Sequence, residues 1–317
     1  MTRSFAFLAD STVYFGNLDA VARSLGERRP FGNKAYDGGG NVKASDGFLL
    51  GEHLVRRLGA SSSRSPDRLL SAELINLADE PLMRGLCEKD PNAQVFNFAY
   101  AGATSGGRGS RLAGLEDFRI GLRRQAATLA KTASWISAHS DLDVIISGGT
   151  NDVFDFLENN QDQITLALIT PGREDDRHLA ERVAKNVVTN INASLDGITG
   201  LYDEALVIGT TKLSALPRVR EASREIGRTP LIGRSLAGNF RKFADRISAS
   251  INTRLEETFN SDNRNGIFAV NGIEAWESIR SPGFIDTIHP DSQTNHRLAN
   301  FALDQIRDAS GFDSFGL

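Results

Sequence analysis

Short apolar runs alternate with longer helical patterns along the whole chain, and this alternation constrains the fold more than any other feature. The runs are bounded by Gly, Asn or Asp, as buried strands are, and there are five of them: Ser4–Ala9, Gln94–Ala99, Leu142–Ile146, Ala205–Gly209 and Gly266–Val270. Strands that alternate with helices favour one parallel sheet with helices on both faces. We therefore expect an α/β fold, a three-layer α/β/α sandwich around a central, mainly parallel five-stranded sheet.

Helical periodicity occupies the intervening stretches. These are Gly47–Leu58, Leu115–Ile136, Arg177–Leu201, Asn239–Phe259 and the closing segment Ser292–Arg307. No internal repeat and no linker divides the sequence, so we expect residues 1–317 to form one domain. In sheets of this kind ligands bind beyond the carboxyl ends of the strands. The residues that directly follow the apolar runs are therefore the candidates for function.

Composition excludes several classes of function. With 40% hydrophobic residues, 24% charged residues and a net charge of −4, the 317-residue chain is typical of a globular protein in water. It has no basic run and no interleaving of basic and aromatic residues, so we expect no nucleic-acid partner. It also lacks a stretch of about 18 apolar residues, so we expect no transmembrane segment.

Cysteine and histidine usage argues against disulfides and metals. Cys87 is the single cysteine, which excludes an intramolecular disulfide, and no Cys/His cluster has zinc-ligand spacing. The Gly- and Ser-rich stretch Gly102–Arg111 lacks the Gly-Lys-Ser/Thr ending of a phosphate-binding loop. We therefore expect neither a metal nor an organic cofactor.

The start of the sequence bears on location. The apolar run Phe5–Ala9 begins within a few residues of Met1, which leaves no room for a secretory signal. We expect a cytoplasmic protein from the sequence as written. The alternative is a secreted or periplasmic protein whose signal has been removed.

Three polar blocks follow predicted strands, and each could be ordinary structure when taken alone. Asp10-Ser11 follows the first run, where a turn would hold the Ser11 hydroxyl at the sheet edge, although an isolated Asp-Ser is usually a turn or cap. Gly102 lets a backbone N–H approach a ligand closely, or is a plain strand-to-loop glycine. Asn151 can donate its amide to an oxyanion, or form a turn or helix cap.

A fourth block, Asp286-Thr287-Ile288-His289, brings a carboxylate and an imidazole close together. Histidine is the usual general base near neutral pH, and a neighbouring carboxylate fixes its tautomer. Chance Asp-x-x-His matches are common. The four blocks together, however, supply the nucleophile, base, orienting carboxylate and oxyanion donors that acyl transfer needs.

These blocks resemble the motifs of the GDSL (SGNH) serine esterases and lipases. The similar segments are Ala9–Asn17 for Gly-Asp-Ser-Leu-Ser-Asp-x-Gly-Asn, Asn97–Ala103 for Asn-x-Ala-x-x-Gly-Ala, Gly149–Asp152 for Gly-x-Asn-Asp and Asp286–Pro290 for Asp-x-x-His-Pro. Further similarities lie at Ser45–Gly47, Glu52–Leu54, Leu58-Gly59 and Asn239-Phe240. The resemblance covers almost the whole chain in the family's order.

The resemblance implies a flavodoxin-like SGNH-hydrolase fold and a serine-dependent carboxylic ester hydrolase. By motif position it implies Ser11 as nucleophile, His289 as base and Asp286 as the partner of His289. It also implies an oxyanion hole made by the N–H groups of Ser11 and Gly102 and the side chain of Asn151. No cofactor is implied, and the implied substrates are small-molecule, lipid or sugar esters, lysophospholipids among them.

Departures from the family pattern surround the predicted nucleophile. Ala9 replaces a glycine, Thr12 and Val13 replace Leu-Ser, and Tyr14 stands where the family often has Asp. These changes bear on substrate preference more than on catalysis. We expect the rim of the site in three loops that follow predicted strands: Phe31–Asn41, Gly102–Arg111 and Ala215–Arg228.

Three alternatives stay open. Gly233–Ala237 is nearly a Gly-x-Ser-x-Gly elbow, and Ser235 with Asp286 and His289 has the α/β-hydrolase order, although Thr229–Ile232 is too short and Pro-broken for the strand that an elbow needs. An acyltransferase acting on a sugar or lipid alcohol would use the same site. A catalytically idle carbohydrate- or protein-binding module would be expected to have lost a catalytic residue, and none is lost here.

Overall fold

The structure, a computed structural model, describes residues 2–11, 44–58, 70–71, 94–109, 120–136, 140–171, 174–260 and 266–308. Within these ranges one parallel sheet has the order β2-β3-β1-β4-β5-β6. Its strands are β1 (Thr2–Ala9), β2 (Leu70–Ser71), β3 (Val95–Asn97), β4 (Ser140–Ser147), β5 (Glu204–Ile208) and β6 (Ile267–Val270). The five predicted strands are confirmed, and β2 is a two-residue addition at the edge.

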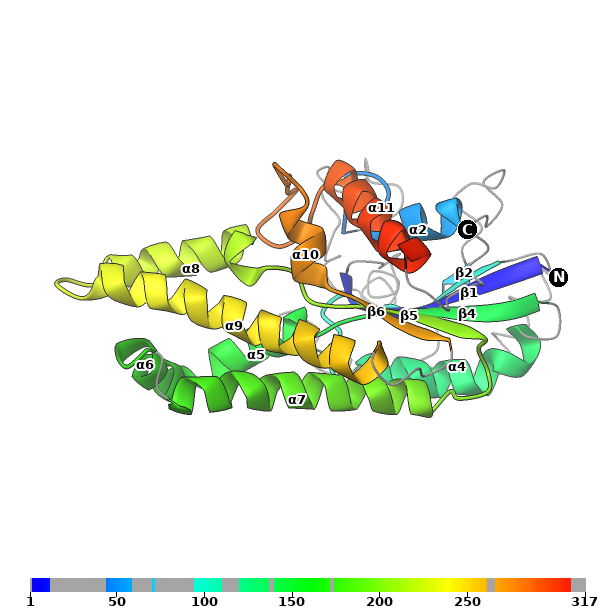
Figure 1. Ribbon diagram of the computed structural model, residues 1–317, viewed down its shortest axis with the longest axis horizontal. Coiled ribbons are helices and arrows are strands. Elements are labelled where there is room, and N and C mark those ends of the chain that lie inside the picture. The colour runs from blue at the N-terminus through cyan, green and yellow to red at the C-terminus, as the bar shows by residue number, and fades with distance from the viewer. Residues whose placement is uncertain are drawn as a thin grey trace, which may run out of the picture.

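Helices flank this sheet on both faces (Figure 1). They are α2 (Leu50–Arg57), α4 (Leu122–Ile136), α5 (Thr150–Asn159), α6 (Gln161–Ile169), α7 (Glu174–Asp196), α8 (Pro217–Gly227), α9 (Gly233–Phe259), α10 (Gly272–Glu277) and α11 (Ser292–Asp308), with a short 3₁₀ turn, η6 (Leu213–Ala215). Helices form where all five helical patterns are predicted, with shifted ends. The expected α/β/α sandwich is therefore the observed fold.

Alternating residues of β1 point to the two faces of the sheet, because successive side chains of a strand point in opposite directions. Phe5 and Phe7 are fully buried and pack in the cluster that includes residues of α2 and α11. Ala6 and Leu8 are equally buried in the larger cluster on the other face, which α4, α7 and α9 cover. A strand buried on both faces reads as a continuous apolar run, which is why the sequence predicts it.

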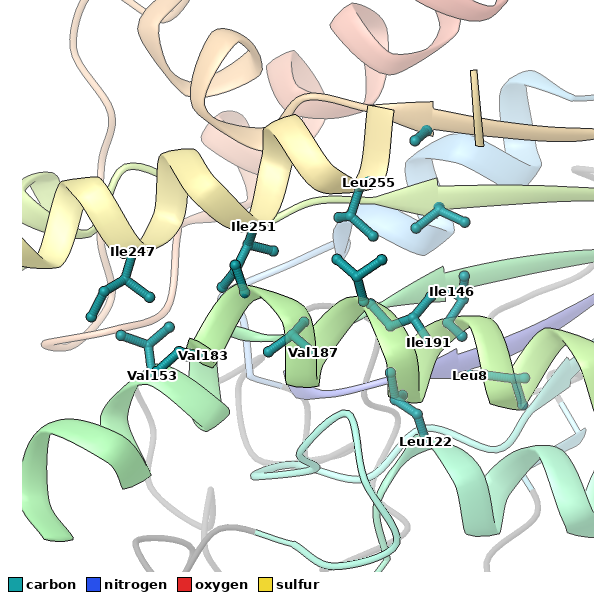
Figure 2. Packing of buried hydrophobic residues seen from close by; sticks show 14 of the residues in the cluster. Leu8, Leu122, Ile146, Val153, Val183, Val187, Ile191, Ile247, Ile251 and Leu255 are labelled. Carbon is teal, nitrogen blue, oxygen red and sulfur yellow. The ribbon is translucent and has the colours of Figure 1, made fainter. Parts of the chain in front are cut away.

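The larger core lies between the sheet and two long helices, α7 and α9, which lie side by side and run in the same direction (Figure 2). Ile247, Ile251 and Leu255 of α9 recur at helical spacing and face the similarly spaced Val183, Val187 and Ile191 of α7. All six are buried. This packing gives the sheet a rigid base on the side away from α2 and α11.

The expectation of a rim loop at residues 215–228 was wrong, because most of this segment is helix α8. Pro217 stands at the first helical position, where its missing N–H breaks no helical hydrogen bond. Val219 and Ser223, one turn apart, are buried, and the Ser223 hydroxyl donates to the carbonyl of Ala237 in α9 at 3.0 Å. Pro217 thus begins a helix in a segment that was expected to be a rim loop because it follows a predicted strand.

The strand order singles out the carboxyl end of β1. After β1 the chain forms β2 at one edge of the sheet and then β3, which lies between β2 and β1. It then adds β4, β5 and β6 in order on the other side of β1. Adjacent crossovers therefore diverge beside β1, and such a switch point is where parallel sheets bind ligands. Ser11 lies just beyond this strand end.

No helix in the described ranges is both long and apolar enough to cross a membrane. Within the same ranges, no three His, Cys, Asp or Glu side chains come together as a metal-binding group.

Candidate active site

A cavity of about 90 Å³ lies at the carboxyl edge of the sheet. Ser11 after β1, Asn151 at the start of α5 and His289 before α11 all line it. Most of the other lining side chains are apolar, including Leu49, Leu50, Val270, Trp276, Ile288 and Leu298. The structure therefore brings three of the sequence-predicted residues to one mainly apolar cavity.

The backbone before Ser11 is fixed by a residue that sequence reasoning missed. The buried Gln125 of α4 accepts a hydrogen bond from the Ala9 N–H at 2.8 Å and donates to the Ala9 carbonyl at 3.0 Å. These two bonds pair both backbone polar groups of Ala9, the last residue of β1. Asp10 is buried next to it, and Ser11 is half-buried.

Asp286 and His289 form a close pair within one tight turn. Nδ1 of His289 lies 2.5 Å from Oδ2 of Asp286, while Oδ1 of Asp286 accepts from the N–H groups of Ile288 and His289, each at 2.7 Å. With the Nδ1 proton shared with the carboxylate, the other ring nitrogen, Nε2, is the acceptor of a neutral imidazole. The carboxylate therefore sets both the ring orientation and the shape of the turn.

Neighbouring elements hold this turn from several sides. Phe284 and Pro290 form an antiparallel bridge across it, and the buried Trp276 of α10 contacts the Phe284 ring at 5.5 Å between centroids. The N–H of Arg218, in the first turn of α8, donates to the Thr287 carbonyl at 2.8 Å. The imidazole is thus carried by a braced segment.

The segment before α2 is hydrogen-bonded to the start of α11, next to the His289 turn. Asp46 accepts the Ser292 N–H at 2.8 Å, and the Ser292 hydroxyl accepts the Phe48 N–H at 2.9 Å. Gly47 lies between these two bonds, and a Cβ there would stand 2.9 Å from Ser292 Cβ. The start of α11, directly after the His289 turn, is therefore fastened to residues 46–48.

Asn151 connects three of the four sequence blocks. Its Nδ2 donates to the Ala103 carbonyl at 3.0 Å and lies 3.5 Å from Oδ2 of Asp10. Gly149, which precedes α5, has φ 108°, and a Cβ there would meet Thr210 at 2.8 Å, so glycine is required. Gly102, at φ 76°, is next to Ala103 but is not among the residues that line the cavity.

The glycine-rich loop at residues 102–109 ends against the N-terminus of α4. The Thr104 and Gly106 carbonyls accept the N–H groups of Leu122 and Arg123 at 2.9 and 3.1 Å. A Cβ on Gly121 would lie 2.1 Å from the Gly106 carbonyl oxygen, so this approach is very close. The loop itself therefore occupies these two helix N–H donors, which in a phosphate-binding loop would face the ligand.

Asp152 ties the same loop to α5. Its carboxylate accepts the Ser105 N–H at 2.8 Å and the Ser105 hydroxyl at 2.6 Å, and Asn190 of α7 donates to that hydroxyl at 3.3 Å. Burial raises the pKa of Asp152 to about 6, although the hydrogen bonds from Ser105 act in the opposite direction. The Gly-x-Asn-Asp block thus carries a structural carboxylate beside the predicted oxyanion donor.

Ser235, the rival nucleophile, does not lie at this cavity. It is an exposed residue in the first turn of α9, and helix α8 precedes it instead of the strand that a nucleophile elbow requires. The motif positions Thr12–Asn17, with Tyr14 among them, and the expected rim loop Phe31–Asn41 lie outside the described residues.

Comparison with known proteins agrees with this architecture. Residues 7–302 match the family model described as GDSL-like lipase/acylhydrolase. The protein is thus an α/β/α hydrolase of ester bonds. The chain belongs to the GDSL-like lipase/acylhydrolase family.

A solved structure, that of the lipase Lip_vut3 from a goat rumen metagenome, is similar, with a TM-score of 0.49 and 12% sequence identity over 98% of this chain and 99% of that chain. No curated protein matches the sequence.

Proposed function

We propose that the protein hydrolyses carboxylic esters through an acyl-enzyme on Ser11, with His289 as general base and Asp286 as its partner. The observation that carries the proposal is a shared cavity. Ser11 and His289, from opposite ends of the chain, line the same cavity, and His289 is paired with Asp286 at 2.5 Å. A hydroxyl, an imidazole and an orienting carboxylate are the three groups that serine-based acyl transfer uses.

The reaction proceeds in two steps. Nε2 of His289 takes the Ser11 proton as Oγ attacks the ester carbonyl, and the imidazolium that forms is stabilised by Asp286. Collapse of the tetrahedral intermediate expels the alcohol, which receives that proton. His289 then activates a water molecule, which attacks the acyl carbonyl and releases the acid, so that Ser11 regains its proton.

The negative charge of each tetrahedral intermediate requires hydrogen-bond donors. We assign these to the N–H groups of Ser11 and Gly102 and to the Asn151 side chain. The hydrogen bond to the Ala103 carbonyl orients the Asn151 amide, while the 3.5 Å contact with Asp10 is long enough for a substrate oxyanion to compete with it. A preorganised donor of this kind contributes roughly 10²–10³ to the rate.

The cavity lining favours an aliphatic acyl group. Leu49, Leu50, Trp276 and Leu298 provide apolar surface, and Asp10 and His289 are the only acidic or basic side chains among the lining residues in the described ranges. Burying acyl methylenes there contributes about 0.8 kcal/mol per CH₂. Aliphatic esters, lysophospholipids among them, are the proposed substrates.

Replacing the nucleophile tests the mechanism. Ser11→Ala should abolish turnover of a chromogenic aliphatic ester because no acyl-enzyme can form, while the thermal unfolding midpoint stays within a few degrees of the parent. Ser235→Ala is the matched control, since it removes a serine hydroxyl from an exposed helix turn, and it should keep full activity. Retained turnover in Ser11→Ala, or its loss in Ser235→Ala, would refute the assignment.

A further inference from the structure

The turn between α8 and α9 exposes two large apolar side chains. Leu231 is fully exposed (105%) and Ile232 is 53% exposed. Leu231 also has φ 69°, the only positive value at a non-glycine residue in the described part of the chain. A leucine in this conformation is strained by about 1–2 kcal/mol, so neither burial nor backbone preference explains its presence.

Basic residues surround this turn in a chain that is acidic as a whole. Residues 217–242 contain seven Lys or Arg and two Glu, although the net charge of the protein is −4. Arg228 and Arg234 stand on either side of the apolar turn, and both are exposed. Of the seven basic residues, only Arg218 makes an ion pair within the described ranges, with Glu158. The hairpin therefore presents uncompensated positive charge.

Helix α6 extends the apolar surface at the same end of the molecule, where Figure 1 shows it beside the α8–α9 hairpin. Leu166 and Ile169 of α6 are each 57% exposed. A groove of about 450 Å³ lies between this helix and the hairpin, and its apolar lining includes Ile164, Leu168, Ile226 and Leu236. An exposed patch of this kind on a folded protein marks an interaction site.

We propose that this end of the protein docks on the surface of an anionic lipid bilayer. Leu231 and Ile232 enter the boundary between headgroups and acyl chains, and Arg228 and Arg234 lie at the level of the lipid phosphates. Apolar side chains flanked by unpaired basic residues suit such an interface, which offers both hydrocarbon and negative charge. A second copy of the chain is a poorer occupant, because two basic tips repel each other.

Vesicle binding of the full chain tests this proposal. The protein should sediment with phosphatidylcholine vesicles that contain about one third phosphatidylglycerol, and much less with phosphatidylcholine alone. Binding should weaken as salt is added, because ions screen the contact with the headgroups. The proposal does not depend on the role of Ser11, so Ser11→Ala should bind these vesicles as the parent does.

Two variants separate the charged contribution from the apolar one. Arg228→Gln with Arg234→Gln should lower the partition coefficient about 30-fold, because each basic residue near the surface contributes about fivefold. Leu231→Asn should lower it roughly tenfold, and asparagine accepts the positive φ, so folding is spared. The control removes two exposed positive charges elsewhere, Lys131→Gln with Lys185→Gln, and should bind nearly as well as the parent.

Three results would overturn the proposal. The first is a parent protein that binds neither kind of vesicle, and the second is a pair of tip variants that bind as the control does. The third is a concentration-dependent dimer that Leu231→Asn abolishes, without vesicle binding, which would make the turn a self-association surface. Hydrolysis of a water-soluble ester should be unchanged in the tip variants, so failure of this proposal is distinct from failure of the catalytic one.

Discussion

At the scale of single residues, the site depends on side chains that hold the backbone in place. Gln125 bonds both polar groups of Ala9, and Asp152 bonds Ser105 twice. Neither side chain is among the predicted catalytic groups. Their hydrogen bonds hold the backbone next to Ser11 and next to Asn151. Such supporting contacts determine how well a site is preorganised.

The raised pKa of Asp152 makes stability depend on pH. Burial raises it from 3.8 to about 6, so between these values the folded protein keeps a proton that the unfolded chain has lost. Stability from this group is therefore present below pH 4 and lost as pH rises through 6. Asp152→Asn should gain about 1–3 kcal/mol relative to the parent between pH 4 and pH 7, measured by urea unfolding at both values.

A difference between Asp152→Asn and the parent that stays constant from pH 4 to pH 7 would contradict this account. It would mean that the carboxylate is as well solvated in the folded protein as in the unfolded chain.

The predicted catalytic residues were accessible from the sequence because each belongs to a short local motif. Gln125 was not, because its partner Ala9 is 116 positions away and the bond depends on the packing of α4 beside β1. The role of Asp152 was hidden in a similar way, since Ser105 lies 47 positions before it. Contacts between distant residues leave no periodic or local pattern.

At the scale of elements, α2 and α11 meet through a pair of histidines. His53 stacks on His296 at 4.9 Å between ring centroids with an interplanar angle of 18°, and the Phe48 ring meets its edge at 5.5 Å. Burial, with the nearby His296, Arg56 and Arg57, lowers the pKa of His53 to about 4. The contact between these helices therefore favours a neutral His53.

Acid should weaken this contact. Between pH 6.5 and about 4 the unfolded chain binds a proton at His53 that the folded protein does not. Stability from this group is therefore present above pH 6.5 and lost as pH falls toward 4, opposite in sign to the Asp152 effect. His53→Phe keeps a ring against His296 and should gain about 1–3 kcal/mol relative to the parent over this range.

The control for His53→Phe is His178→Phe, which changes an exposed histidine of α7. Urea unfolding at pH 4 and pH 7 should show no such gain for the control. Equal pH dependence in His53→Phe and the parent would show that His53 titrates in the folded protein as it does in the unfolded chain.

The strands and long helices followed from the sequence more closely than the short helices did. Fully buried strands such as β5 give an unmistakable apolar run, and α7 and α9 repeat their apolar residues over many turns. The segment that forms helix α8 was expected to be a rim loop because of its position after a predicted strand. Its stability as a helix comes from α9, against which it packs, and that partner is not visible in the local sequence.

At the scale of the whole molecule, the two ends of the chain meet at one edge of the sheet. Asp46 and Ser292 are 246 positions apart and share a hydrogen bond, and Ser11 and His289 line one cavity. The α8–α9 hairpin extends from this edge of the sheet and carries the basic, apolar turn (Figure 1). The proposed membrane contact therefore lies on a hairpin that extends from the edge of the sheet where the proposed active site lies.

Covalent labelling tests the central claim, that Ser11 is an activated nucleophile, most directly. A fluorophosphonate reacts with a serine only when a base removes its proton, so the intact protein should be labelled once, on the peptide that contains Ser11. Mass spectrometry should show that His289→Ala reduces this labelling at least a hundredfold. Labelling of Ser235 instead, or an unlabelled Ser11 in folded protein, would contradict the account.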